Sequence, residues 1–214
     1  METKIDKKLL NTLENKKTFI FDFDGTISST YGILFKTLET MFKNHGFVFS
    51  LDEFNALKGK PSTVYFEKFE EVTKQKQDPQ KMAEEFSEIF EQKTKTEKLF
   101  CYDYVKQLIK KFPNKNFVVA SNNFEQFLSD RLVEFEIREN FSKIVACTNK
   151  LKKQYVYQNT ISLFGTNPKD CALFEDDQKY INEAKKEGIL TVGIVHDYNQ
   201  NLDADFFIAE DWKI

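Results

Sequence analysis

The sequence has few of the residues that mark disulfide-stabilised, zinc-binding or membrane proteins. Its 214 residues include three cysteines, Cys101, Cys147 and Cys171, which stand far apart without a C-x-x-C pair. This spacing indicates neither a disulfide framework nor a zinc cluster. The first residues are charged, and no run approaches the roughly 18 apolar residues that a membrane helix needs. We therefore expect a cytoplasmic protein with reduced thiols.

The chain also lacks an excess of either charge. It has 31 basic and 34 acidic residues, which give a formal net charge of −3 at pH 7. This balance offers no electrostatic reason to expect binding to nucleic acid or to an anionic membrane. The two histidines, His45 and His196, have no metal-ligand spacing, and we interpret both as ordinary surface or core residues.

Short apolar runs alternate with amphipathic helical segments along most of the chain. Hydrophobic residues make up 41% of the sequence, which is enough for one full core. The apolar runs are residues 18–21, 117–120, 144–147, 172–174, 190–195 and 206–209. Strands that alternate with helices predict an α/β fold, in which a mainly parallel sheet is covered by helices on both faces.

One long stretch, from about residue 31 to about residue 97, has helical patterns and no convincing strand. Within it, Ser50 and Glu53 have the spacing of a capping box at the start of a helix. We expect a helical domain of residues 30–96 inserted into an α/β core that consists of residues 1–29 and 97–214.

Asp22 and Asp24 are the sharpest chemical feature of the sequence. They follow an apolar run directly, and their i, i+2 spacing in an extended chain places both carboxylates on the same side. The carboxyl end of a parallel strand is the usual position of a ligand crevice. Two acids at a buried strand end repel each other and cost desolvation, so a cation between them would stabilise the pair. Magnesium is suited to this position, and a solvated acidic turn is the alternative.

Two further polar groups follow later apolar runs in the same way. Ser121 and Asn122 follow the second run, where a hydroxyl and the amides that open a helix can hold a phosphate. Glu175, Asp176 and Asp177 follow the fourth run and could complete a metal site. Taken singly, Ser121 could equally be a helix cap, and the acids a solvated turn.

Three lysines, Lys150, Lys152 and Lys153, lie between these two groups and precede an expected helix. For each lysine taken singly, a solvated helix start is the simpler interpretation. The order of acid pair, hydroxyl, lysine and acid cluster is improbable by chance, because three of the four follow strand-like runs.

This order resembles the haloacid dehalogenase superfamily, and within it the phosphoglycolate phosphatase and β-phosphoglucomutase branch. The resemblance extends from Phe19-Ile-Phe-Asp-Phe-Asp-Gly-Thr26 to the segment 204–209, and it is also strong at Leu173-Phe-Glu-Asp-Asp177. It implies a Rossmann-like core with a helical cap and a magnesium-dependent phosphatase that forms an aspartyl-phosphate. The substrate would be a small phosphorylated metabolite, and the protein a monomer or weak homodimer.

The resemblance also implies roles for individual residues. Asp22 would be the nucleophile, and Asp24 would be the general acid and then the general base. The residues that would bind the phosphoryl group are Thr26, Ser121, Asn122 and a lysine. The residues that would hold magnesium are Asp22, Asp24 and Asp176, helped by Glu175 or Asp177.

The sequence departs from the family pattern at the lysine, because the Lys-Pro pair of the family is missing. Counting back from Gly165, the shorter family spacing favours Lys153, whereas the longer spacing falls between Lys150 and Lys152. We rank Lys153 first and Lys150 second. A phosphosugar mutase and a catalytically silent binding protein on the same fold are the alternative functions.

Overall fold

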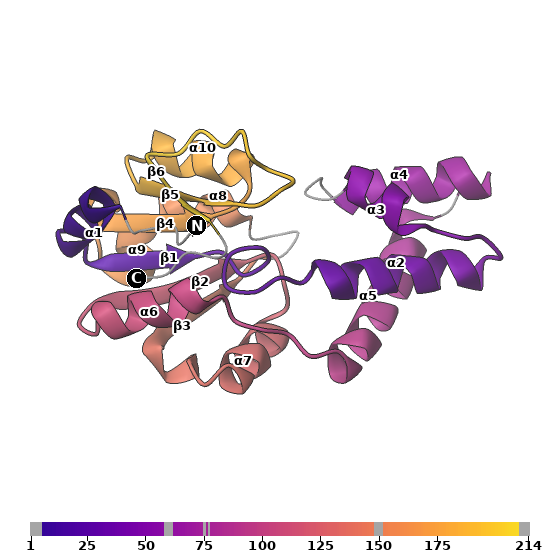
Figure 1. Cartoon of the computed structure of the whole chain (residues 1–214), viewed down its shortest axis with the longest axis horizontal. Coiled ribbons are helices and arrows are strands. Elements are labelled where there is room, and N and C mark those ends of the chain that lie inside the picture. The colour runs from indigo at the N-terminus through magenta and orange to yellow at the C-terminus, as the bar shows by residue number, and fades with distance from the viewer. Residues whose placement is uncertain (1–5, 58–61, 75, 77, 148–151, 210–214) are drawn as a thin grey trace. The chain divides into compact units, whose positions relative to one another are not determined.

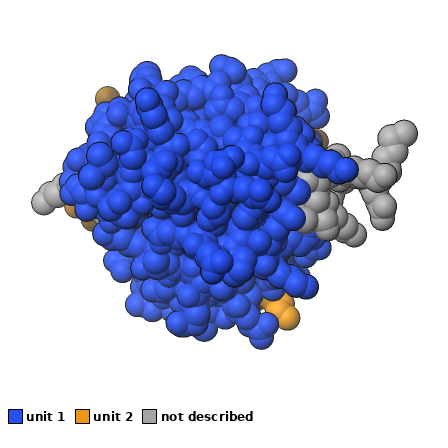
Figure 2. Space-filling model, turned by 90° about the vertical axis from the view of Figure 1, so that its left-hand side faces the viewer, with its two compact units in different colours: residues 1–29, 100–214 blue, residues 30–99 orange. Residues whose placement is uncertain are grey.

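The structure is a computed structural model that describes residues 6–57, 62–74, 76, 78–147 and 152–209. The chain forms two compact units, coloured separately in Figure 2. Met1–Ser29 and Phe100–Ile214 make up one, which we call the sheet unit. Thr30–Leu99 makes up the other, which we call the helical unit.

The sheet unit contains a six-stranded sheet in which all neighbouring strands are parallel. The strands are β1 (Thr18–Phe21), β2 (Asn116–Ser121), β3 (Phe141–Ala146), β4 (Cys171–Glu175), β5 (Leu190–Val195) and β6 (Phe206–Ala209), in the order β3-β2-β1-β4-β5-β6. β2 and β3 lie on one side of β1, and the later strands β4, β5 and β6 lie on its other side. The order therefore reverses between β1 and β4, which is where ligands bind in such sheets.

Helices flank both faces of this sheet (Figure 1). They are α1 (Lys7–Glu14), α6 (Asp103–Lys111), α7 (Glu125–Glu134), α8 (Lys153–Gln158), α9 (Thr160–Phe164) and α10 (Gln178–Lys186), with short 3-10 helices at Arg138–Asn140 and Pro168–Asp170. This arrangement confirms the predicted α/β class with a parallel, Rossmann-like sheet.

Successive side chains of the central strands β1 and β4 point to opposite faces of the sheet, so each face has its own core. On one face, Ile20 and Leu173 pack in a cluster with residues of α8 and α10. On the other face, the rings of Phe21 and Phe174 are stacked with their centroids 4.3 Å apart. The fully buried β1 thus holds the segment that follows it in a fixed place, because residues on both faces of the strand are packed.

The helical unit contains α2 (Tyr31–Asn44), α3 (Leu51–Leu57), α4 (Ser62–Thr73) and α5 (Pro79–Thr96), and the described part of it has no strand. Its core is aromatic: Phe42 stacks on Phe49 at 4.5 Å and meets Phe69 edge to face at 4.9 Å. The predicted capping box at α3 is confirmed, because the Glu53 amide donates to Ser50 Oγ and the Ser50 amide donates to the Glu53 carboxylate.

Among the described helices, none combines the length and the apolar character that a membrane span requires.

Candidate active site

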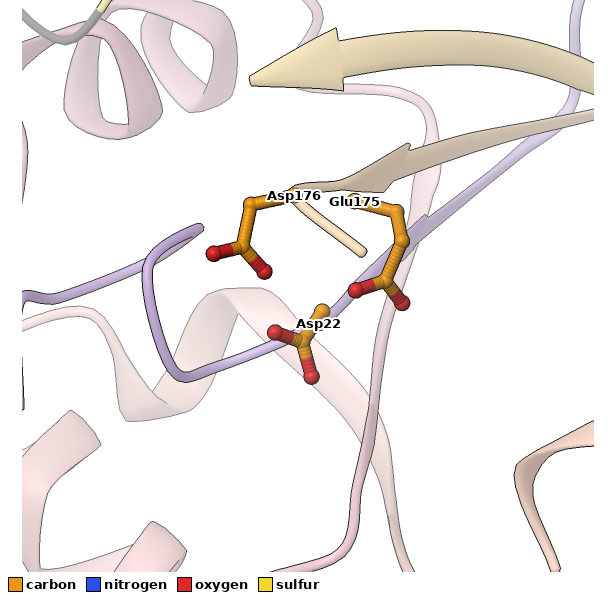
Figure 3. Close-up of side chains that lie close together, drawn as sticks. All are labelled: Asp22, Glu175 and Asp176. Atoms are coloured by element: carbon orange, nitrogen blue, oxygen red, sulfur yellow. The ribbon is translucent and has the colours of Figure 1, made fainter. Parts of the chain in front are cut away.

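Three carboxylates meet at the carboxyl ends of β1 and β4, where the strand order reverses. Asp22 follows β1, Glu175 ends β4 and Asp176 follows it. The Asp22 amide donates to the carbonyl of Phe174 at 3.0 Å, so the pairing of the two strands extends into the site. The three side chains point toward one another (Figure 3), and one oxygen of each lies within 4.8 Å of the others.

Lys153, the first residue of α8, reaches into this acid cluster. Its Nζ donates to Asp22 Oδ1 and, at 3.1 Å, to Glu175 Oε2. The lysine is only 3% exposed. Burial by itself lowers the pKa of Lys153, but the charges of Asp22 and Glu175 outweigh it and hold this pKa well above its usual value. The ammonium is therefore charged at neutral pH.

If its three acids were all ionised, the cluster would hold more negative charge than Lys153 can balance. Burial raises the pKa of Asp22 and, together with the charge of Asp22, raises that of Glu175. Burial and the charge of Asp22 raise the pKa of Asp176 to about 8. Burial is the largest cause of each shift, and the charge of Lys153 only partly offsets it, so ionising all three acids together requires further positive charge. Because their oxygens are hard ligands and lie close together, the residues fit a divalent cation such as magnesium.

Asp24 lies outside this group of three acids. Its Oδ2 accepts a hydrogen bond from Asn123 Nδ2 at 2.6 Å and a longer one from Ser121 Oγ at 3.5 Å. Asp22 therefore contacts a lysine, whereas Asp24 contacts polar side chains at the end of β2. The two acids of the motif have different surroundings although they are two residues apart.

Gly25 allows the turn after β1 to approach Asp176 closely. Its φ is +78°, and a Cβ at this position would lie 2.2 Å from Asp176 Oδ2. Any side chain here would collide with the carboxylate, so the turn requires glycine in both conformation and space. The Thr26 hydroxyl in the same turn is buried and has no hydrogen-bond partner among the described residues.

Ser121 and Asn122 lie at the end of β2, next to β1. Ser121 Oγ accepts a hydrogen bond from the Asn123 amide at 3.2 Å. Asn122 Nδ2 donates to the hydroxyl of Tyr180 at 3.0 Å, and the Tyr180 ring lies over Lys153 Nζ, 4.4 Å from the ring centroid. Tyr180 thus connects the lysine to Asn122 through a cation–π contact and a hydrogen bond.

The sequence matches the family described as haloacid dehalogenase-like hydrolase over residues 19–194. The chain belongs to this family. No curated protein sequence gives a significant match.

Solved structures share the fold of this haloacid dehalogenase-like hydrolase. A predicted phosphoglycolate phosphatase from Haemophilus somnus 129pt is 18% identical, with a TM-score of 0.73, over 90% of this chain and 93% of that chain. A β-phosphoglucomutase from Clostridium difficile is 17% identical, with a TM-score of 0.69, over 90% of each chain. CbbY from Rhodobacter sphaeroides, in complex with phosphate, is 17% identical, with a TM-score of 0.71, over 90% of this chain and 93% of that chain.

The structure separates the candidate residues that the sequence left open. Lys153 lies in the acid cluster, Lys152 is exposed, and Lys150 lies outside the described residues. Glu175 joins Asp22 and Asp176 in the acid cluster. The Asp177 side chain instead caps the N-terminus of α10, where it accepts a hydrogen bond from the Lys179 amide at 2.8 Å.

Several residues at the site were missed by sequence reasoning. His196, Tyr198 and Asn199 follow β5 and bond to the turns after β1 and β4. The interpretation of His196 as an ordinary surface or core residue did not include this contact with the Gly25 carbonyl. The available signal was positional, because these residues follow an apolar run at the same sheet edge as Asp22 and Ser121.

Proposed function

We propose that this haloacid dehalogenase-like hydrolase is a magnesium-dependent phosphatase that hydrolyses a small phosphorylated metabolite through an aspartyl-phosphate on Asp22. One observation carries the proposal: the Asp22 carboxylate is buried between the Lys153 ammonium and two further carboxylates. Phosphoryl transfer depends mainly on positioning and on neutralisation of charge, which such an arrangement can supply.

In the first step, an Asp22 carboxylate oxygen attacks the phosphorus atom and forms an O–P bond. The bond from phosphorus to the leaving oxygen breaks, and Asp24 donates a proton to the departing alkoxide. In the second step, water gives a proton to Asp24 and attacks the phosphorus atom, which releases phosphate and restores the Asp22 carboxylate. The hydrogen bond from Asn123 supports this role of Asp24, because it orients the carboxyl group at the end of β2.

Lys153 would neutralise the phosphoryl oxygens during both steps, and the proposed contacts to these oxygens come from Thr26, Ser121 and Asn122. Lys150 remains a candidate from the sequence. Magnesium would be held by Asp22, Glu175 and Asp176, with Asp24 and Asp177 as the further ligands that the resemblance implies. When bound, the ion supplies positive charge that the phosphoryl oxygens and the acid cluster both require.

We also propose that the helical unit is the cap that selects the substrate. The candidate substrates are phosphoglycolate, sugar phosphates and nucleoside monophosphates. The cytoplasmic location, the monomeric or weakly dimeric state, and the lack of a nucleic-acid or membrane partner remain predictions.

A screen of phosphate release over a panel of these metabolites tests the proposal. We expect at least one substrate to be hydrolysed with magnesium and the rate to collapse in excess chelator. Hydrolysis that continues undiminished in chelator would contradict the role of the metal. Transfer of phosphate between isomers without its release would indicate a phosphosugar mutase, and no turnover of any ester would favour a silent binding protein.

A further inference from the structure

Three side chains from the segment after β5 bond to the turns that follow β1 and β4. The Tyr198 hydroxyl donates a hydrogen bond to Asp176 Oδ2 at 2.9 Å. Asn199 Nδ2 donates to the backbone carbonyl of Asp176 at 2.8 Å. His196 Nε2 lies 2.6 Å from the carbonyl of Gly25, and because a carbonyl can only accept, this nitrogen carries the hydrogen.

The segment is itself held in a defined conformation. The His196 amide donates to Asn199 Oδ1 at 2.6 Å, and Asn199 Nδ2 also donates to the Ile194 carbonyl at 3.0 Å. The rings of His196 and Tyr198 are stacked, with centroids 4.9 Å apart and planes inclined by 10°. The oxygen and the nitrogen of the Asn199 side-chain amide therefore both form hydrogen bonds, and the His196 and Tyr198 rings pack against each other. Because these contacts restrict the Tyr198 side chain, its hydroxyl can hold the Asp176 carboxylate in one position.

Tyr198 and Gly25 confine the Asp176 carboxylate. A Cβ built on Gly25 would lie 2.2 Å from Asp176 Oδ2 and 2.9 Å from the Tyr198 hydroxyl, so all three groups converge on one small volume. The position of this oxygen relative to Asp22 therefore depends on the Tyr198 hydroxyl.

We propose that Tyr198 is a positioning residue for the magnesium site, in which it holds the Asp176 carboxylate beside Asp22. His196 and Asn199 act with it by tying the turn after β1 to the turn after β4. The proposal rests on the proposed function, because it requires Asp176 to be a metal ligand. Groups that hydrogen-bond to metal-ligating carboxylates orient them and strengthen metal binding.

Direct measurement of magnesium binding separates this role from a general contribution to stability. The variant is Tyr198→Phe, which removes the hydroxyl and keeps the ring that stacks on His196. The matched control is Tyr155→Phe, because Tyr155 is 43% exposed and lies outside the acid cluster. Titration calorimetry of the whole chain with magnesium chloride and no substrate gives the dissociation constant of each protein.

We expect Tyr198→Phe to bind magnesium roughly 10–100-fold more weakly than the wild type, and the control to bind it normally. At saturating magnesium, KM for the substrate should change little, because the phosphate contacts remain. Equal magnesium affinities for Tyr198→Phe and the wild type would overturn the proposal. A wild-type protein that binds no magnesium would overturn the magnesium-dependent function itself, and this inference with it.

A second pair of variants keeps the test valid if Tyr198→Phe folds poorly, which thermal unfolding would reveal. His196→Gln retains an N–H donor for the Gly25 carbonyl, whereas His196→Leu does not. We expect magnesium affinity to fall more in His196→Leu than in His196→Gln. Equal affinities in both variants would show that this hydrogen bond does not position the site.

Discussion

Among the residues that the structure describes, the sheet unit buries charged side chains, whereas the helical unit buries none. The buried carboxylates and lysine of the described chain, Asp22, Lys153, Glu175 and Asp176, all belong to the sheet unit. In the described part of the helical unit, the buried side chains with polar groups are uncharged: the phenol of Tyr65 and the threonines Thr30, Thr37, Thr73 and Thr94. The hydroxyls of Thr37 and Thr94 donate to carbonyls of their own helices, at 2.8 and 2.7 Å.

The two units differ in what it costs to bury their polar groups. A threonine hydroxyl that bonds to its own helix costs little to bury, whereas a carboxylate or ammonium costs several kcal/mol unless it is paired. The aromatic core of the helical unit is explained by packing alone. Packing does not explain the acid cluster of the sheet unit, because burying three carboxyl groups around one lysine is costly, and this cost is the reason to look for a functional role there.

The largest effect should come from removal of the nucleophile. Asp22→Asn should lower kcat by at least about 10⁴-fold and abolish the phosphoenzyme, because an amide is a poor nucleophile. Rapid-quench trapping with a labelled, activated phosphate ester measures this directly. Label that accumulates on Asp22→Asn would refute the assignment of the nucleophile.

Asp24→Asn is the matched comparison within the same motif. It should slow turnover by roughly 10²–10⁴-fold, because general acid–base catalysis is lost while the nucleophile remains. With an activated ester, whose leaving group needs little protonation, label should still appear on this variant and then be hydrolysed slowly.

The next largest effect should come from the buried lysine. Lys153→Ala should lower kcat/KM by roughly 10²–10³-fold, because it removes a charge aimed at the phosphoryl group. Lys152→Ala, at an exposed position, is the control and should behave like the wild type, and Lys150→Ala should cost less than Lys153→Ala. Steady-state kinetics decide the order, and equal losses at positions 150 and 153 would show that the lysine is misassigned.

A smaller effect should appear in the pH dependence of stability without metal. The pKa of Asp176 is about 8 in the folded protein and 3.8 in an ordinary environment, so the native state binds more protons between these values. Stability of the sheet unit should therefore fall as the pH rises from about 4 to about 8. Lys153 adds no opposing trend, since its raised pKa lies above this range.

The helical unit provides the internal control for this pH effect. Its buried phenol, Tyr65, has a pKa that burial raises to about 12, so it does not titrate in the same range. Hydrogen exchange read by mass spectrometry, corrected for intrinsic rates, measures opening of each unit at pH 6 and pH 8.5. Magnesium should stabilise the sheet unit more at the higher pH, where its ligands are ionised. If the opening of the two units changed equally with pH, the pH dependence could not be assigned to the buried acids of the sheet unit.

The smallest effect should come from the helical unit itself. Ser50→Ala removes the cap of α3 and should destabilise the unit by about 1 kcal/mol without changing phosphoenzyme formation. Ser87→Ala, inside α5, is the control and should be neutral or slightly stabilising, because alanine is the best helix former. Urea unfolding measures both, and a loss of stability in Ser87→Ala alone would contradict the role of the cap.

Most of the strands could be located from the sequence, since buried strands are short apolar runs. The expected runs at 18–21 and 206–209 coincide with β1 and β6. The strand expected at 144–147 is instead Phe141–Ala146. It was misplaced because Ser142 and Lys143 are exposed, as a strand at the edge of a sheet allows, and their polarity hid the start of β3.

The sequence by itself determined the family, the parallel α/β core and the acids that follow β1 and β4, because apolar periodicity and the residues after each run are local properties. Tertiary structure decided which side chains meet. Lys153 reaches Asp22, 131 positions away in the sequence, because α8 begins at this lysine and packs on the sheet. Tyr198 reaches Asp176 because β5 lies beside β4. Such contacts depend on strand order and register, which no local pattern in the chain encodes.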